Sequence, residues 1–303
     1  MNKLIIIGSG PAGYTAGIYS ARAELKPVIF SGPSSGGQLM NTSLVENWPG
    51  NKEGILGPQL MMQMREQAVK FGVEIREESV SKIDFSKRPF KVNELEAEAV
   101  IIATGAESIR LHIPGEDRLF GRGVAVCAVC DAPFYKEKTA AVLGGGDSAC
   151  EDALSLTKFA KKVYLIHRRD KLRACKILVQ RVKNNPKIEI LWNSQVTEIL
   201  GENKVEAIRI GQKGNRATEI KVDGVFLALG HRPATDLFKG KIQLNEKNYI
   251  LTGENRDYPT MTSVEGVFAA GDCVDSRYQQ AITAAAMGCQ AALDSERYLE
   301  SRE

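Results

Sequence analysis

The sequence predicts an α/β fold made of two similar three-layer domains, the second inserted in the first. Two observations predict this fold. A glycine turn follows a short apolar run at Gly8–Gly13, and a turn of the same kind follows another apolar run at Gly144–Ala149. Each turn opens a stretch with helical spacing of apolar residues that leads to another apolar run, which is the pattern of a β-α-β unit.

The elements of the two units match in order and in length. The predicted strand, helix and strand are Lys3–Ile7, Pro11–Ala23 and Pro27–Phe30 in the first unit, and Thr139–Leu143, Ser148–Phe159 and Lys162–Ile166 in the second. The first glycine and the residue after the second strand are 23 positions apart in both units, Gly8 to Ser31 and Gly144 to His167. This parallel indicates two domains of common origin rather than a chance match.

Later apolar strands place the domain borders. Val100–Gly105 and Val225–Gly230 end in small residues, and Gly266–Asp272 reads as a further buried strand, which we expect to return to the first domain. Proline and glycine near residues 114 and 233 fit linkers at the two crossings. The predicted domains are residues 1–108, 109–231 and 232–303, of which the first and last form one domain.

Composition and charge exclude several classes of protein. The chain has 303 residues, 43% hydrophobic and 25% charged, as in soluble globular proteins. A net charge of +3 is too small to indicate a nucleic-acid partner. No run approaches the roughly 18 apolar residues of a membrane span, and the apolar run before Gly8 is too short for an export signal. Six cysteines without such a signal predict the reducing cytoplasm.

Both glycine turns are predicted to bind the pyrophosphate of a dinucleotide. Such a turn presents backbone N–H groups and the positive end of the helix dipole to an anion. Gly8 allows the tight bend, Gly10 the close approach and Gly13 the helix–strand contact. The predicted contacts are Gly8, Ser9, Gly10, Pro11, Ala12 and Gly13 in the first unit, and Gly146, Asp147, Ser148 and Ala149 in the second. The domains are thus predicted to be Rossmann-like, FAD/NAD(P)-binding folds.

The segment after each second strand predicts which dinucleotide binds. Neither unit has the acid that normally holds a ribose there. The second unit instead has His167, Arg168, Arg169 and, one turn later, Arg173, which suit the 2′-phosphate of NADPH because guanidinium pairs bidentately with phosphate. The first unit has a Gly/Ser loop that includes Ser31, Gly32, Gly37 and Gln38 and could line the extended FAD molecule. The alternative for the arginines of the second unit is a solvated basic helix start. The alternative for the Gly/Ser loop of the first unit is a surface loop that binds no ligand.

Cys127 and Cys130 form a candidate redox dithiol. Their spacing allows an exchangeable disulfide, and Asp131 could deliver a proton to a leaving thiolate. A zinc site would need four ligands, but the chain has only three histidines and no second Cys-x-x-Cys pair, so we predict no metal. The other cysteines, Cys150, Cys175, Cys273 and Cys289, are expected to be buried small hydrophobes. Cys273 is the exception to watch because it follows Asp272.

From end to end, the chain resembles the low-molecular-weight, bacterial-type thioredoxin reductases of the pyridine nucleotide-disulfide oxidoreductase class. The resemblance rests on both glycine turns and the Cys127–Asp131 motif, and on several other motifs: Gly36–Leu39, Val45–Gly50, Ala103–Gly105, His167–Arg173, Gly266–Asp272 and Gln280–Asp294.

The resemblance implies an NADPH-dependent flavoprotein that reduces thioredoxin. FAD would lie along the first turn and its loop, and at Asn47, Gly271, Asp272, Gln279, Gln280 and Ala281, with Asp272 on the ribityl chain. A helix starting near Gln280 would point its positive end at the flavin. Cys130 would face the flavin, Cys127 would attack thioredoxin, and Asp131 would handle the proton. Family members are homodimers whose two domains rotate between two states.

Three departures from the family leave alternatives open. Val129 stands where the family usually has threonine, Ala132-Pro133 where it has glycine and phenylalanine, and Gln279 where it has arginine. The related alternatives are a flavin disulfide reductase that takes electrons from ferredoxin, and one that feeds another disulfide carrier such as a glutaredoxin-like protein. A non-catalytic nucleotide-binding redox sensor is the alternative of a different class.

Overall fold

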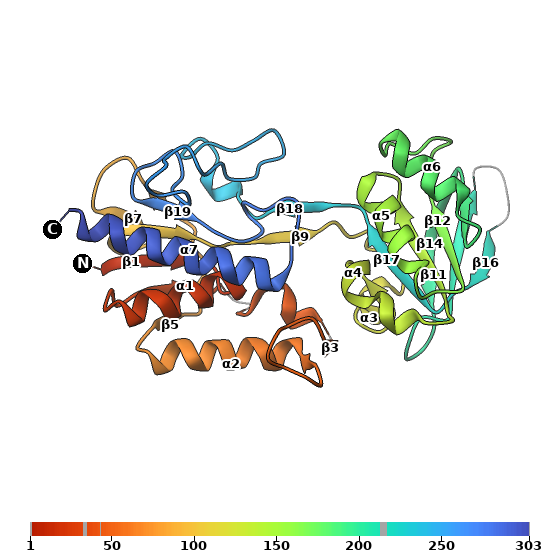
Figure 1. Cartoon of the computed structure of the whole chain (residues 1–303), viewed down its shortest axis with the longest axis horizontal. Helices are drawn as coiled ribbons and strands as arrows, with labels where there is room; N and C mark the ends of the chain where they lie inside the picture. The colour runs from red at the N-terminus through yellow and green to blue at the C-terminus, as the bar shows by residue number, and fades with distance from the viewer. Residues whose placement is uncertain (1, 33–34, 43, 213–216, 303) are drawn as a thin grey trace. The chain divides into compact units, whose positions relative to one another are not determined.

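The structure, a computed structural model, describes residues 2–32, 35–42, 44–212 and 217–302. The chain forms two compact units (Figure 1). Unit 1 comprises residues 1–107 and 231–303, and unit 2 comprises residues 108–230. Strands β9 (Ala106–Ser108) and β18 (His231–Pro233) pair with each other where the chain leaves and re-enters unit 1.

The core of unit 1 is a seven-stranded sheet. Its parallel strands, in spatial order, are β5 (Glu74–Arg76), β2 (Val28–Phe30), β1 (Asn2–Ile7), β8 (Leu95–Ile102) and β19 (Val267–Ala269). Two antiparallel strands, β7 (Phe90–Val92) and β6 (Ile83–Asp84), extend the sheet beyond β8. Because β19 pairs with β8, the strand predicted within residues 266–272 does return to the first sheet.

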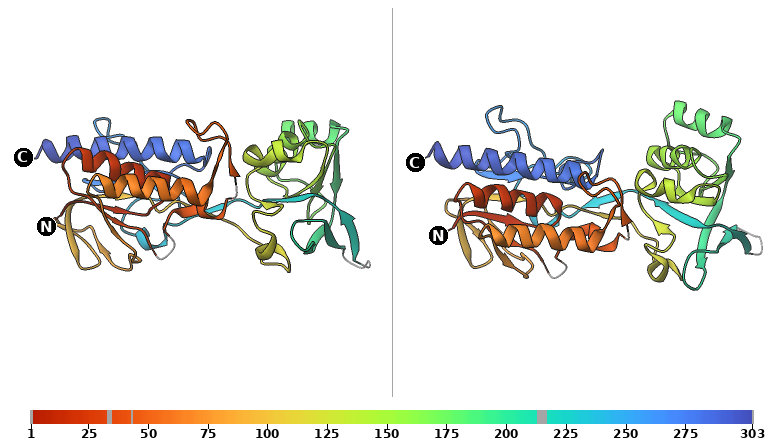
Figure 2. Two further views of the ribbon diagram at one scale, coloured as in Figure 1. Left: turned by 90° about the horizontal axis from the view of Figure 1, so that it is seen from below. Right: turned by 60° about the horizontal axis from the view of Figure 1, so that its bottom comes forward.

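Apolar side chains cover both faces of this sheet. Along β1, Leu4 and Ile6 face one apolar cluster, and Ile5 and Ile7 face the other, as the period of a strand requires. Three helices cover the first face side by side (Figure 2): α1 (Pro11–Arg22), α2 (Gly57–Lys70) and α7 (Ala281–Glu300). The second face is covered by the β6–β7 hairpin and by the segment around η3 (Asp236–Phe238). Short elements complete the unit: η1 (Gly37–Asn41), β3 (Leu44–Val45) and β4 (Ile55–Leu56).

Unit 2 has the same plan with a different third layer. Its parallel sheet contains, in spatial order, β10 (Val124–Ala125), β17 (Gly224–Ala228), β11 (Thr139–Gly144), β12 (Lys162–Ile166) and β13 (Ile188–Leu191). One face carries the helices α4 (Ala128–Asp131), α5 (Asp147–Leu156) and α6 (Lys176–Asn184), together with η2 (Ala132–Tyr135). The other face carries α3 (Glu116–Leu119) and an antiparallel sheet of β14 (Ser194–Leu200), β15 (Ala207–Gln212) and β16 (Thr218–Lys221). The predicted α/β fold with two sheets of this kind is confirmed.

Candidate active site

In the first glycine turn, two glycines pack tightly against backbone carbonyl groups and the glycine between them faces open space. A β-carbon at Gly8 would collide with the carbonyl oxygen of Ala103, and one at Gly13 would collide with the carbonyl oxygen of Gly8. A β-carbon at Gly10 would meet nothing within 4 Å. Gly10 is the N-cap of α1, and Pro11 and Ala12 begin that helix. An anion can therefore approach the backbone N–H groups at this helix start without meeting a side chain.

Ser9 ties the loop after β2 to this turn. Its hydroxyl donates to the carbonyl oxygen of Ser31 (3.0 Å) and accepts from the N–H of Gly36 (3.0 Å). Gly37, with φ +66°, passes so close that a β-carbon there would lie 3.2 Å from Cα of Gly10. The predicted flavin loop is thus anchored at both of its ends beside the turn. Gly32 faces open space and Gln38 is exposed, whereas residues 33 and 34 lie outside the described residues.

A buried carboxylate lies at the end of β19. Gly271 packs so tightly against α1 that a β-carbon there would come within 2.9 Å of Cβ of Ala12. Asp272 follows, and its buried Oδ1 has no hydrogen-bond partner among the described residues. Burial, and to a lesser extent the charge of Asp275, raise the pKa of Asp272 to about 7. A buried acceptor without a donor is costly, so this oxygen suits a hydroxyl group of a bound ligand.

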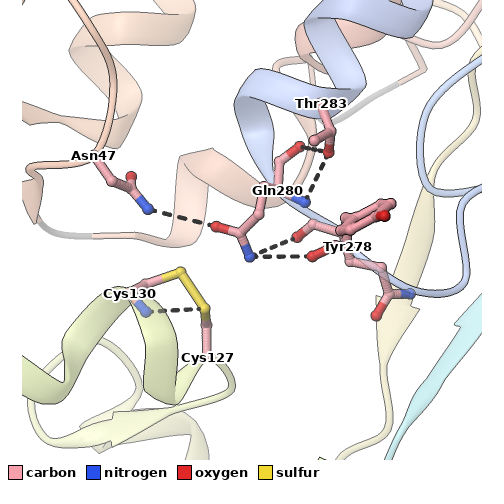
Figure 3. The surroundings of a disulfide bond; sticks show 7 residues. Asn47, Cys127, Cys130, Tyr278, Gln280 and Thr283 are labelled. Carbon is pink, nitrogen blue, oxygen red and sulfur yellow. Dashed lines mark hydrogen bonds between the residues drawn. A yellow bond between two sulfur atoms is a disulfide. The ribbon is translucent and has the colours of Figure 1, made fainter. Parts of the chain in front are cut away.

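The start of α7 is fixed by its own side chains. Gln280 is the N-cap and forms a capping box with Thr283, and the Nδ2 of Asn47 donates to Oε1 of Gln280 (3.5 Å; Figure 3). Gln279 has φ +48°, donates its N–H to Asp275 (2.9 Å) and reaches the Tyr249 hydroxyl with its Nε2 (3.3 Å). Ala281 is the first residue of α7. The structure thus joins Asn47 to Gln280, whereas the amide of Gln279 is directed to Tyr249.

The glycine turn of unit 2 repeats the spacing of the first turn with different residues between and after the first two glycines that both turns share. A β-carbon at Gly144 would collide with the carbonyl oxygen of Ala228, and one at Gly146, the N-cap of α5, would meet nothing within 4 Å. The third position is Ala149, which is fully buried, and Ser148 is exposed in the first turn of the helix. Gly145, which stands where the first turn has Ser9, lies against the imidazole ring of His167.

His167 and the arginines after β12 form the edge of this turn. His167 is only 5% exposed, and its Nε2 finds no hydrogen-bond partner in the part of the chain that the structure describes. Burial lowers the pKa of His167, so its ring is neutral at pH 7. Arg168, Arg169 and Arg173 are exposed, and none of them forms an ion pair with a described residue. Cations without a carboxylate partner, beside an unsatisfied buried nitrogen, suit a phosphate group.

Cys127 and Cys130 form a disulfide, with their Cα atoms 5.4 Å apart. Cys127 is the N-cap of α4, and its Sγ accepts a hydrogen bond from the N–H of Cys130 (3.2 Å; Figure 3). Both cysteines are half-buried, whereas Val129 between them is 67% exposed. An N–H donor at a helix start favours the thiolate form of a cysteine, so Cys127 is the better placed of the two to become a nucleophile.

Two carboxyl groups adjoin this motif, and the sequence predicted only one of them. Burial raises the pKa of Asp131 to about 6, within reach of a proton-transfer role near neutral pH. Burial also raises the pKa of Asp152, to about 7, and the backbone N–H of Ala128 partly opposes this rise. The sequence did contain a signal for Asp152, because this acid lies in α5 between Ala149 and Ala153, which are two buried positions of that helix.

The four remaining cysteines differ in burial. The prediction of buried thiols is wrong for Cys175, which is exposed at the N-cap of α6, and Cys289 is half-buried. Cys150 and Cys273 are buried. Burial raises the pKa of Cys273 to about 11, and its thiol donates to the carbonyl of Ala270 (3.3 Å), so it is inert at neutral pH. Pro133 falls in the first turn of η2, where a helix tolerates proline.

Within the described residues, no helix has the length and apolar character that a membrane crossing requires.

Comparisons with known proteins identify relatives over the whole chain. The family model for pyridine nucleotide-disulphide oxidoreductases matches residues 2–288. A thioredoxin reductase of Debaryomyces hansenii is 49% identical over 319 residues, covering 100% of this chain and 98% of its own. A thioredoxin reductase of Chlamydia pneumoniae is 50% identical over 310 residues, covering 98% of this chain and 99% of its own.

Solved structures agree with these relatives. The thioredoxin reductase of Giardia duodenalis matches with a TM-score of 0.92 and 44% identity, covering 98% of each chain. The thioredoxin reductase of Streptococcus pyogenes matches with a TM-score of 0.92 and 41% identity, also covering 98% of each chain. Both matches include residues of each unit.

Proposed function

Because the chain belongs to the pyridine nucleotide-disulphide oxidoreductases, and within them to the thioredoxin reductases, we propose that it reduces the disulfide of thioredoxin with electrons from NADPH. Electrons would pass through FAD to the Cys127–Cys130 pair. One observation carries the proposal: unit 2 combines a closed Cys127–Cys130 disulfide with a nucleotide turn whose arginines have no described carboxylate partner.

Unit 1 would hold the FAD. The open helix start at Gly10 fits its pyrophosphate, and the unsatisfied Oδ1 of Asp272 fits a hydroxyl of its ribityl chain. The capped start of α7 would present the positive end of its helix dipole to the bound group, where it would stabilise negative charge. When bound, FAD would accept a hydride from NADPH and pass two electrons to the disulfide.

Unit 2 would hold NADPH and the dithiol. The turn at Gly146 fits the pyrophosphate, and His167, Arg168, Arg169 and Arg173 fit the 2′-phosphate. Two electrons would break the S–S bond and leave thiolates at Cys127 and Cys130, and each thiolate can then take up a proton. The Cys127 thiolate would then attack the thioredoxin disulfide, and the Cys130 thiolate would close the internal disulfide again, releasing reduced thioredoxin.

Asp131 would donate and accept the protons that this exchange requires. Its carboxyl lies in the residue after Cys130, and a pKa near 6 leaves a usable fraction of the acid form close to neutral pH. The acid form would protonate the thiolate that leaves in each exchange step, and the carboxylate would take up the proton of the attacking thiol.

Two finer points belong to the same proposal. We infer a homodimer, which the exposed apolar side chains Tyr19, Met62 and Val69 on α1 and α2 of unit 1 support, and sedimentation of the purified protein would test it. We also infer a cytoplasmic location, because an enzyme that keeps a dithiol reduced works in a reducing compartment.

NADPH-coupled reduction of DTNB, with and without oxidised thioredoxin, tests the function. The wild-type protein should be yellow, bleach anaerobically with NADPH and turn over fully only when thioredoxin is present. Cys130→Ser should keep its flavin and lose thioredoxin-dependent turnover. A colourless protein would favour the nucleotide-binding sensor. Bleaching by reduced ferredoxin but not by NADPH would mean that ferredoxin is the electron donor. Turnover with a glutaredoxin-like protein alone would mean that this protein, and not thioredoxin, is the electron acceptor.

A further inference from the structure

Asp147 bonds to a segment that is distant in sequence. It is the first residue of α5, directly after the open Gly146. The sequence predicts Asp147 as a nucleotide contact because of its place in the turn. Its Oδ1, however, accepts a hydrogen bond from the backbone N–H of Cys175, 2.7 Å away. Cys175 is the N-cap of α6, so the carboxylate joins the glycine turn to the start of another helix.

A second hydrogen bond joins the same two segments. The N–H of Arg173 donates to the carbonyl oxygen of Gly145, 2.6 Å away. The two bonds bracket Ala174 and fix the backbone on both sides of it. The direction in which the Arg173 side chain leaves the backbone therefore depends on both bonds.

The charges around the turn make this bonding pattern significant. A carboxylate beside a phosphate site would repel the phosphate, or would pair with the arginines that should bind it. Asp147 instead accepts a backbone N–H and lies at the positive end of α5, which stabilises an acid. Arg168, Arg169 and Arg173 thus keep their guanidinium groups available.

We propose that Asp147 is a positioning residue for selectivity toward the 2′-phosphate, because its side-chain oxygen holds the Arg173–Cys175 segment on the glycine turn. This inference rests on the proposed use of NADPH. It requires a hydrogen-bond acceptor at Oδ1, which asparagine also supplies, and it does not require the negative charge. Asp147 itself need not touch the nucleotide.

Three variants of the flavin-loaded protein separate these requirements. Asp147→Ala removes both the acceptor and the charge, and Asp147→Asn removes only the charge. Asp170→Ala is the matched control, because it removes an exposed carboxylate from the same arginine-rich segment, and no described residue bonds to that carboxylate. Calorimetry would measure binding of 2′,5′-ADP and of 5′-AMP, which lacks the 2′-phosphate. Amide hydrogen exchange would report protection of the Cys175 N–H.

Asp147→Ala should weaken 2′,5′-ADP binding about tenfold and change 5′-AMP binding less than about twofold, since one hydrogen bond to a charged group is lost. Asp147→Asn and Asp170→Ala should bind 2′,5′-ADP as tightly as the wild type, or more tightly. The Cys175 amide should lose its protection in Asp147→Ala alone, a change that an effect of charge would not produce.

Other results would overturn the inference in distinguishable ways. If Asp147→Ala and Asp147→Asn both tighten 2′,5′-ADP binding, the carboxylate only repels the phosphate. If Asp147→Ala weakens both ligands equally, its role is general stability of unit 2. If the wild type prefers 2′,5′-ADP and Asp147→Ala keeps that preference, this inference alone is wrong. If the wild type shows no preference for 2′,5′-ADP, the proposed NADPH donor is wrong as well.

Discussion

In unit 1, the first glycine of the nucleotide turn packs against the carbonyl of Ala103, and in unit 2 its counterpart packs against the carbonyl of Ala228. The middle glycines, Gly10 and Gly146, both face open space at a helix start. The two turns differ in how the next loop is fixed. Unit 1 uses a neutral hydroxyl, that of Ser9, whereas unit 2 uses the carboxylate of Asp147.

The group that fixes each loop matches the charge of that loop. The loop after β2 has glycine and serine, so a hydroxyl can fix it without a change in the local potential. The segment after β12 has three arginines, and Asp147, which accepts the backbone N–H of Cys175, adds a nearby negative charge without pairing with those arginines. We infer that a shared backbone plan binds the pyrophosphate, and that the loop after the second strand selects the rest of the dinucleotide.

The largest expected effect comes from the third position of the two turns. In Gly13→Ala the new β-carbon would collide with the backbone carbonyl of Gly8, so α1 must move away from β1. We expect a loss of about 3 kcal/mol in the free energy of unfolding and loss of most of the bound flavin. Urea unfolding and flavin absorbance would measure both.

The reverse change in unit 2 is the matched control for this prediction. Ala149→Gly creates no collision and should cost only about 1 kcal/mol, the difference in helix propensity. Equal losses in the two variants would mean that the turns do not differ at this position in the way that their packing indicates.

The features that are local in sequence were the ones that could be predicted. Both glycine turns, the strands on either side of them and the helix starts follow from short patterns, and the predicted strand Lys162–Ile166 has the same bounds in the structure. The predicted helix Ser148–Phe159 ends earlier, at Leu156, because a turn follows there. Helix bounds depend on such packing more than on spacing.

Features that depend on tertiary packing could not be predicted. The alternation of apolar residues in β14 is interrupted by a register shift between Val196 and Glu198, so this antiparallel sheet lacks a clear period of two. Asp152 reaches the dithiol motif only because α5 packs against α4. The bond from Asp147 to Cys175 spans 28 positions, and no short motif indicates it.

The second prediction tests whether the arginines of unit 2 select the dinucleotide. Arg168→Ala combined with Arg169→Ala should raise the KM for NADPH by at least about 100-fold, since each lost charged hydrogen bond costs at least about 1.5 kcal/mol. The KM for NADH should change less than about threefold, because NADH has no 2′-phosphate. Steady-state kinetics with both donors would measure this split.

An exposed arginine on α6 provides the control. Arg181→Ala removes one positive charge, half as many as the double variant, from the same unit but from the last turn of that helix. Its KM for NADPH should stay within about twofold of the wild type, because a solvent-screened charge at that distance contributes little. A similar rise in KM for both changes would mean that overall charge, rather than the segment after β12, attracts NADPH.

The smallest expected effect concerns Asp272 of unit 1, which follows β19 and has a buried carboxyl oxygen without a described partner. Its pKa is about 7 in the folded protein and near 3.8 in the unfolded chain, so the folded state binds the proton more tightly. The free energy of unfolding should therefore fall as pH rises from about 4 to above 7. In the flavin-free protein, Asp272→Asn should gain about 1–2 kcal/mol over the wild type at pH 8 and clearly less at pH 5, where only part of the loss has developed.

Bound flavin should reduce this difference between the two proteins, because a ligand hydroxyl that donates to Oδ1 stabilises the ionised carboxylate. Thermal unfolding at both pH values, with and without flavin, measures the effect, and Asp170→Asn corrects for the general loss of one negative charge. A gain at pH 8 that is as large with flavin as without it would mean that no ligand donor reaches Oδ1. The buried carboxyl of Asp272 would then only destabilise unit 1 and would not be part of its binding site. Flavin binding would in that case depend on the glycine turn and its loop alone.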